Sequence, residues 1–162
     1  LVGSLYISLH LEVERSLSMD QAHSLASQLE DMLRHELPNV QDVDVHIEPA
    51  NHRDVQDVDV HIEPANHRDA QAVPADDATR RRVRAAIDEA IAAVGGLGRC
   101  YDVLVFRNEG SLRASAHCAV DGELTVDQAH ALSRRVEHHV REHMPELSQV
   151  TVHMEPRPRS TP

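Results

Sequence analysis

Aromatic residues, lysine and cysteine are scarce or absent in this sequence of 162 residues. Aromatic side chains make up 2% of the chain, every basic side chain apart from histidine is arginine, and the formal net charge is −11. A protein that follows a phosphate backbone needs a clustered positive face, and single-strand binders also need rings on which bases stack. The arginines cluster only at 80–84, where the start of a solvated helix accounts for them. The composition therefore argues against nucleic acid as a partner.

Cysteine is limited to Cys100 and Cys118, which form neither a CxxC pair nor a zinc-ribbon spacing. Cys118 lies on the apolar side of a predicted strand, so we expect a buried, reduced thiol there. So few cysteines, together with the lack of a signal-peptide pattern, favour a reducing compartment.

Long apolar runs are also missing. The longest apolar tract, around Ile91–Val94, is far too short to span a bilayer. Because the sequence starts at Leu1 in the middle of a pattern, we expect it to be a fragment of a longer protein, about whose membrane segments it says nothing.

One pattern of histidines and a glutamate occurs twice at a constant offset of 107 residues. The first copy reads SLHLEVERSLSMDQAH and later VDVHIEP, and the second reads SAHCAVDGELTVDQAH and later VTVHMEP. The matched pairs are His10 and His117, His23 and His130, His46 and His153, and Glu48 and Glu155. Such a constant spacing indicates two modules of one type, and the retained side chains are those that bind transition metals.

The second module is the complete one, over residues 77–157. Helical spacing predicts a helix over Ala78–Val94, and alternation predicts strands over Tyr101–Phe106 and Leu112–Val120. A capping box at Thr125 opens a helix that Pro145 ends, and Val150–Met154 forms the last strand. The order α-β-β-α-β predicts an α+β fold of the ferredoxin-like type, with helices on one side of an open sheet.

The first module, residues 1–54, lacks the opening helix and strand. It starts in a strand over Leu5–Val13, continues with a helix capped by Ser18 and closed by Pro38, and ends in a strand over Val43–Ile47. Residues 55–76 hold a repeated segment and a linker, because Val40–Asp54 recurs unchanged as residues 55–69. The copy either adds a strand or dangles, and 158–162 form a tail.

Strand alternation places the candidate ligands on one face of the sheet. Val43, Val45 and Ile47 point toward the helices, so His46 and Glu48 point away from them, together with Asp44. His10 shares this helix-free face if the two strands are neighbours, and the second module repeats the arrangement. His23 and His130 lie in the first turns of their helices, from which they can reach a sheet edge or another subunit.

At these residues the chain resembles the cytoplasmic C-terminal domain of cation diffusion facilitator (cation efflux) transporters. The matching text is HLEVERSLSMDQAH with VHIEP, and the more divergent HCAVDGELTVDQAH with VHMEP. The resemblance implies a metallochaperone-like α-β-β-α-β fold that pairs through its open sheet face and binds divalent cations, typically zinc, at the interface. It implies metal ligands at His10, His23, His46, Glu48, His117, His130, His153 and Glu155. An ungapped match puts Asp102 where the family has a further histidine ligand.

The resemblance also implies a function and partners. We expect two tandem modules that form a metal-binding regulatory and dimerisation domain, the cytoplasmic portion of an inner or plasma membrane transporter for a divalent cation. Its partners would be the cation, the membrane domain of the parent transporter, and a second module, paired either within the chain or in a homodimer. The alternatives are a free-standing metal chaperone or buffer and a structural pairing domain without metal. No catalytic signature such as HExxH occurs, so we do not expect an enzyme.

Overall fold

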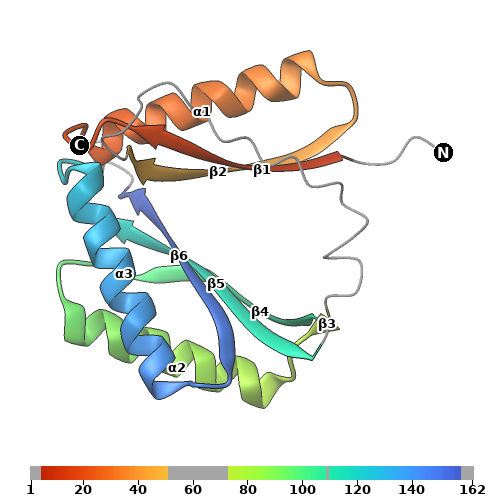
Figure 1. Cartoon of the computed structure of the whole chain (residues 1–162), viewed down its shortest axis with the longest axis vertical. Coiled ribbons are helices and arrows are strands. Elements are labelled where there is room, and N and C mark those ends of the chain that lie inside the picture. The colour runs from red at the N-terminus through yellow and green to blue at the C-terminus, as the bar shows by residue number, and fades with distance from the viewer. Residues whose placement is uncertain (1–4, 51–72, 109, 158–162) are drawn as a thin grey trace, which may run out of the picture.

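The computed structural model describes residues 5–50, 73–108 and 110–157 as two small sheets with helices packed against them. One sheet has the strand order β1-β2, and the other has the order β3-β4-β5-β6. Figure 1 shows α1 along the first sheet and α2 and α3 along the second, with β2 and β6 nearest to each other. The chain therefore has the α+β fold that the sequence predicts.

The N-terminal unit consists of β1 (Leu5–Val13), α1 (Met19–Glu36) and β2 (Val40–Pro49). The two strands are parallel neighbours, as a βαβ crossover requires. The predicted capping box is present, because the Ser18 hydroxyl accepts from the Gln21 amide and the Gln21 side chain accepts from the Ser18 amide. Ile7, Leu9 and Val43 form a small core beneath α1.

The C-terminal unit has the predicted α-β-β-α-β order. Its elements are α2 (Asp77–Val94), β4 (Cys100–Asn108), β5 (Ser111–Val120), α3 (Val126–His143) and β6 (Leu147–Pro156). A short strand, β3 (Val73–Pro74), pairs with β4 at one edge of the sheet. Alternate residues of β5 are buried and pack with Val83, Ile87, Val136 and Val140 of the two helices.

The two units contact each other at the turns that precede α1 and α3. The N-cap residues Ser18 and Thr125 form an antiparallel bridge. The Met19 amide donates to the Leu124 carbonyl, and the Val126 amide donates to the Leu17 carbonyl. These two bonds exchange roles under the 107-residue offset, as contacts do across a two-fold axis. Beneath the bridge, six buried apolar side chains from both units form one cluster: Val13, Met19, Ala22, Val120, Val126 and Ala129.

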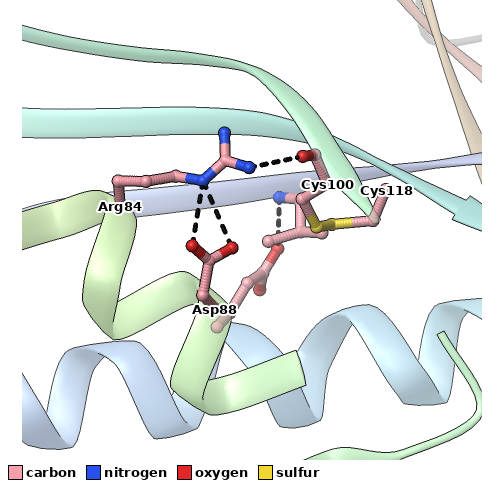
Figure 2. Close-up of a disulfide and its surroundings, with 6 residues drawn as sticks. Arg84, Asp88, Cys100 and Cys118 are labelled. Atoms are coloured by element: carbon pink, nitrogen blue, oxygen red, sulfur yellow. Dashed lines mark hydrogen bonds and ion pairs between the residues drawn. A yellow bond between two sulfur atoms is a disulfide. The ribbon is translucent and has the colours of Figure 1, made fainter. Parts of the chain in front are cut away.

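The expectation of a reduced thiol at Cys118 is wrong, because a disulfide joins this residue to Cys100 (Figure 2). The two residues lie opposite each other in the β4–β5 pairing, with their Cα atoms 4.0 Å apart. A register shift between Tyr101 and Leu104 creates this pairing, since without it Cys100 would face the next residue of β5.

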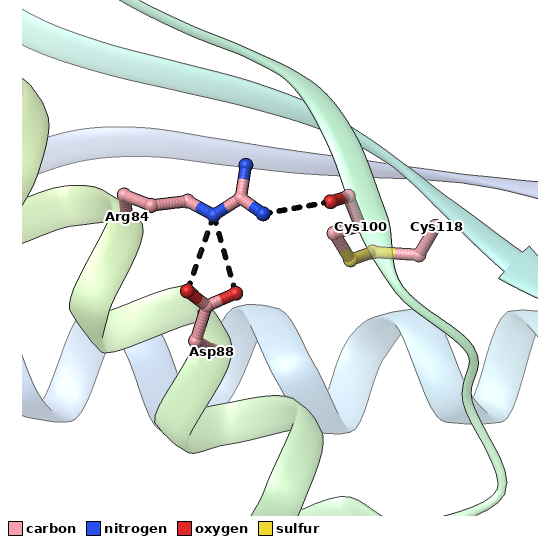
Figure 3. Close-up of polar contacts among 4 residues, drawn as sticks. All are labelled: Arg84, Asp88, Cys100 and Cys118. Atoms are coloured by element: carbon pink, nitrogen blue, oxygen red, sulfur yellow. Dashed lines mark hydrogen bonds and ion pairs between the residues drawn. A yellow bond between two sulfur atoms is a disulfide. The ribbon is translucent and has the colours of Figure 1, made fainter.

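A neighbouring ion pair fixes the strand at this disulfide. The Arg84 guanidinium bonds both carboxylate oxygens of Asp88 at 3.2 Å, and it donates to the Cys100 carbonyl at 3.0 Å (Figure 3). Helix α2 is thereby tied to the start of β4.

Several sequence expectations concern the segment between the units. The repeated residues 55–69 lie outside the described residues, as do residues 1–4 and 158–162. Part of the expected linker, Val73–Pro74, is strand β3. No helix in the described part of the chain is both long and apolar enough to cross a membrane.

Candidate metal centre

Four histidine rings form a continuous row across the junction of the two units. His10 and His46 are register partners in the parallel pair β1–β2, and their ring centroids lie 5.2 Å apart. His117 and His153 occupy the equivalent places on β5 and β6, with centroids 4.6 Å apart. The row closes between the units, where the His46 and His153 rings lie 3.8 Å apart. We call His10, His46, His153 and His117, in this order, the histidine row.

A carboxylate stands at each end of the histidine row. His10 Nδ1 lies 3.0 Å from Glu48 Oε1, and His117 Nδ1 lies 2.8 Å from Glu155 Oε1. Each pair joins neighbouring strands, on the helix-free face that alternation predicts. An imidazole that bonds a carboxylate through Nδ1 presents Nε2 for a second interaction, which is the arrangement of a metal ligand supported by an outer carboxylate.

Burial keeps the two central rings neutral. Desolvation, together with each ring's histidine neighbour, lowers the pKa of His46 and the pKa of His153 to about 4. A metal ion binds neutral imidazole, so both central rings are in the binding form at neutral pH. Two unprotonated rings in contact are also chemically consistent, whereas two imidazolium ions at this separation would repel each other.

The His117 end carries the opposite electrostatics. The hydrogen bond to Glu155 raises the pKa of His117, and the same bond lowers the pKa of Glu155 to about 2. The Tyr101 hydroxyl donates to the other Glu155 oxygen, and burial with this bond raises the pKa of Tyr101 to about 12. Glu155 is thus a fixed anion held by two donors.

Asp44 is a candidate ligand that the sequence-based set of ligands omitted. Its carboxylate and the ring nitrogens of His46 and His153 supply donor atoms that all lie within 4.8 Å of one another. Alternation along β2 already places Asp44 on the face of His46, and this was the signal available in the sequence. The equivalent residue in the second unit, Thr151, has no carboxylate, so the central cluster is asymmetric.

The helix histidines and Asp102 differ in their relation to the histidine row. His23 on α1 and His130 on α3 line the same cleft as the row, from opposite sides of the junction. The charge of His23 contributes to the lowered pKa of Glu155, which belongs to the other unit. Asp102 does not line this cleft: it is exposed within the irregular part of β4, with φ of 48°. The neighbouring Tyr101 instead contacts the row, its ring centroid 6.0 Å from that of His117.

The donor set of the cleft fits a divalent first-row cation. The cleft has a volume of about 890 Å³ and lies between the helix-free faces of the two sheets. Neutral imidazoles from both units and the Asp44 carboxylate converge on it. Nitrogen and carboxylate oxygen suit zinc and its neighbours in the first row, and ligands drawn from both units would tie the units together.

Comparison with protein families gives a match over most of the chain. Residues 2–50 and 79–157 match the family model described as the cytoplasmic domain of cation efflux proteins. No curated protein matches the chain.

Several solved structures are similar to part of the chain. The zinc form of CzrB is 25% identical, covers 55% of this chain and 97% of its own, and has a TM-score of 0.48. The metal-bound C-terminal domain of the CzcD transporter from Thermotoga maritima is 19% identical, covers 51% and 96%, and has a TM-score of 0.46. The cytosolic domain of a cation diffusion facilitator family protein is 21% identical, covers 51% and 98%, and has a TM-score of 0.46.

Proposed function

Because this chain belongs to the family of cation efflux protein cytoplasmic domains, we propose that it binds a divalent cation between its two helix-free sheet faces and thereby regulates the pairing of its two units. Zinc is the first candidate, since imidazole and carboxylate donors suit it. The family is not an enzymatic one, and the proposal requires no reaction.

The observation that carries this proposal is the histidine row. Its central rings, His46 and His153, come from different units and lie 3.8 Å apart, with Asp44 beside them. Burial without a metal or a hydrogen-bonding partner is unfavourable for imidazole nitrogen, so a site that collects four rings needs a compensating interaction. A cation that accepts lone pairs from both central rings supplies this interaction. Glu48 and Glu155 then orient the outer rings, and His23 and His130 are further donors along the cleft.

We further propose that the two units are tandem copies of one ferredoxin-like domain, the first shortened, that pair within the chain. The constant offset of 107 residues and the exchanged hydrogen bonds Met19–Leu124 and Val126–Leu17 support this proposal. A pair joined by a linker forms at an effective concentration that does not depend on protein concentration.

Regulation would follow from a shift in population. A cation that needs donors from both units binds only when their sheet faces are close together, so it stabilises the closed arrangement over an open one. In a parent efflux protein this shift would pass to the membrane domain. The ratio of cation affinities in the two arrangements sets the size of the shift.

A second candidate function is structural pairing without metal. The apolar cluster below the N-cap bridge, including Met19 and Val126, holds the two units together with no cation. A metal chaperone has less support, because such proteins present exposed thiols and both cysteines here are buried in a disulfide.

Size-exclusion chromatography with light scattering, and a metal assay of the same peak, tests the proposal. We expect zinc in the peak, the mass of one chain at every protein concentration, and a smaller hydrodynamic radius than in chelator. The double variant H46A/H153A should keep the larger radius in zinc, whereas the control H35A, which alters an exposed histidine in the last turn of α1, should behave as the parent. A radius that zinc leaves unchanged in the parent chain would favour the structural candidate.

A further inference from the structure

A second group of potential ligands lies between the two helices of the C-terminal unit. Glu89 on α2 and His139 and His143 on α3 place donor atoms within 4.8 Å of one another. None of these residues lines the cleft of the histidine row. We call these three residues the interhelix cluster.

The tautomer of His143 suits a ligand. Its Nδ1 lies 2.8 Å from the His139 carbonyl oxygen, and because a carbonyl only accepts, Nδ1 must carry the proton. Nε2 is then the nitrogen with a free lone pair. A backbone carbonyl that holds one ring nitrogen of a histidine is a common support for a metal bond at the other nitrogen.

His139 provides the second observation. Its Nε2 is buried and has no hydrogen-bond partner among the described residues. The ring stacks on that of His143, with centroids 4.2 Å apart and 22° between planes. A buried polar atom without a partner destabilises the fold by about 1–3 kcal/mol, so such atoms in native proteins usually have a partner such as a water or an ion.

Glu89 supplies negative charge from the facing helix. It is exposed, and within the described part of the chain no basic side chain forms an ion pair with it. On the same helices, the other carboxylates with basic neighbours are paired, as Asp88 is with Arg84 and Glu142 with His138.

We propose that the interhelix cluster is a second binding site for a divalent first-row transition cation, separate from the histidine row. Two imidazoles four residues apart on one helix and a carboxylate from the next helix make three protein ligands, which leaves positions for water. A cation held in this way would link α2 to α3. The cluster is not part of the repeated pattern, because Met32 and Glu36 occupy the positions equivalent to His139 and His143 in the first unit.

Calorimetric titration of the full chain with zinc chloride tests this assignment. We expect E89Q and H143A each to weaken one class of zinc sites at least tenfold and to leave the other class unchanged. H46A/H153A should give the reverse pattern, so the failure of either site is visible without reference to the other. Both single substitutions change exposed side chains, so the metal-free variants should melt at the temperature of the parent.

The matched control is H138A, which alters the adjacent exposed histidine that pairs with Glu142 at 3.2 Å. It should bind zinc as the parent does. The assignment is overturned if E89Q and H143A titrate as the parent, or if H138A weakens binding as much as H143A, because the latter result indicates uptake by surface histidines in general.

Discussion

His46 and His153 are 107 residues apart in the sequence, and their rings lie 3.8 Å apart at the junction of the two units. Each ring also stacks or packs against the histidine of the neighbouring strand in its own unit. This one contact converts two separate pairs of histidines into a row. The row in turn gives the junction a polar centre next to its apolar cluster.

The His117–Glu155 hydrogen bond should be visible in an NMR titration of the metal-free chain. We expect the pKa of His117 above its ordinary value of 6.5, while His46 and His153 stay neutral to about pH 4. The variant E155Q should lower the pKa of His117, because a neutral amide stabilises imidazolium less than a carboxylate does. The matched change at the other end of the row, E48Q, should leave His117 unaffected. Equal titration of His117 in the parent and in E155Q would contradict this account.

The buried central rings should make the protein less stable as the pH falls from 6.5 to about 4. Above pH 6.5 both rings are neutral in the folded and unfolded chains, but within this interval the unfolded chain binds protons that the folded chain excludes. Allowing for partial exposure, we expect a loss of about 1–3 kcal/mol for each ring.

Urea unfolding at a series of pH values measures this loss. The raised pKa of His117 acts in the opposite sense, because its contribution is present below pH 6.5 and disappears as the pH rises through its folded value. The comparison is therefore with H46Q/H153Q, whose slope between pH 6.5 and 4 should be flatter. An identical slope in parent and variant would show that the central rings are not protected from protonation.

The apolar cluster at the junction should contribute measurably to stability. Met19 is 2% exposed there, whereas Met32 on the same helix is 60% exposed. We expect M19A to lower the free energy of unfolding by about 2–5 kcal/mol, through lost burial and the resulting cavity. M32A makes the same change outside the cluster and should have an effect within about 0.5 kcal/mol. Equal effects in urea unfolding would mean that the two units are not packed together in solution.

The Cys100–Cys118 disulfide closes a short hairpin and should stabilise the C-terminal unit. For a sequence separation of 18 residues, restriction of the unfolded chain gives about 3 kcal/mol. Unfolding in the presence of a reductant should show this loss, and the variant C100S/C118S should be insensitive to the reductant. A parent chain with the same stability in both conditions would show that the disulfide does not form, as expected for a strongly reducing compartment.

Local sequence signals predicted most of the secondary structure. The boxes at Ser18 and Thr125 cap α1 and α3, and Pro38 and Pro145 follow their ends, because caps and proline act through neighbouring residues. Alternation placed His10 and His46 on one face, since the side-chain direction of a strand follows from its period of two.

Features that depend on distant pairings were not predicted. The disulfide requires the irregular register beside Asp102, which no local pattern indicates. The same irregularity puts Tyr101, rather than Asp102, against His117. The interhelix cluster depends on how α2 packs on α3, so Glu89 could not be linked to His139 and His143 from spacing alone.

The two ends of the histidine row differ in detail. Glu155 has both His117 and Tyr101 as hydrogen-bond donors, whereas His10 is the donor that the described residues offer to Glu48. The carboxylate at the first end is also slightly more exposed, at 37% against 33%. In an assembly of identical subunits every substitution appears twice, so both halves of an interface must change together. Joining both halves in a single polypeptide removes this constraint, and each end of the row is free to acquire its own affinity and its own rate of exchange.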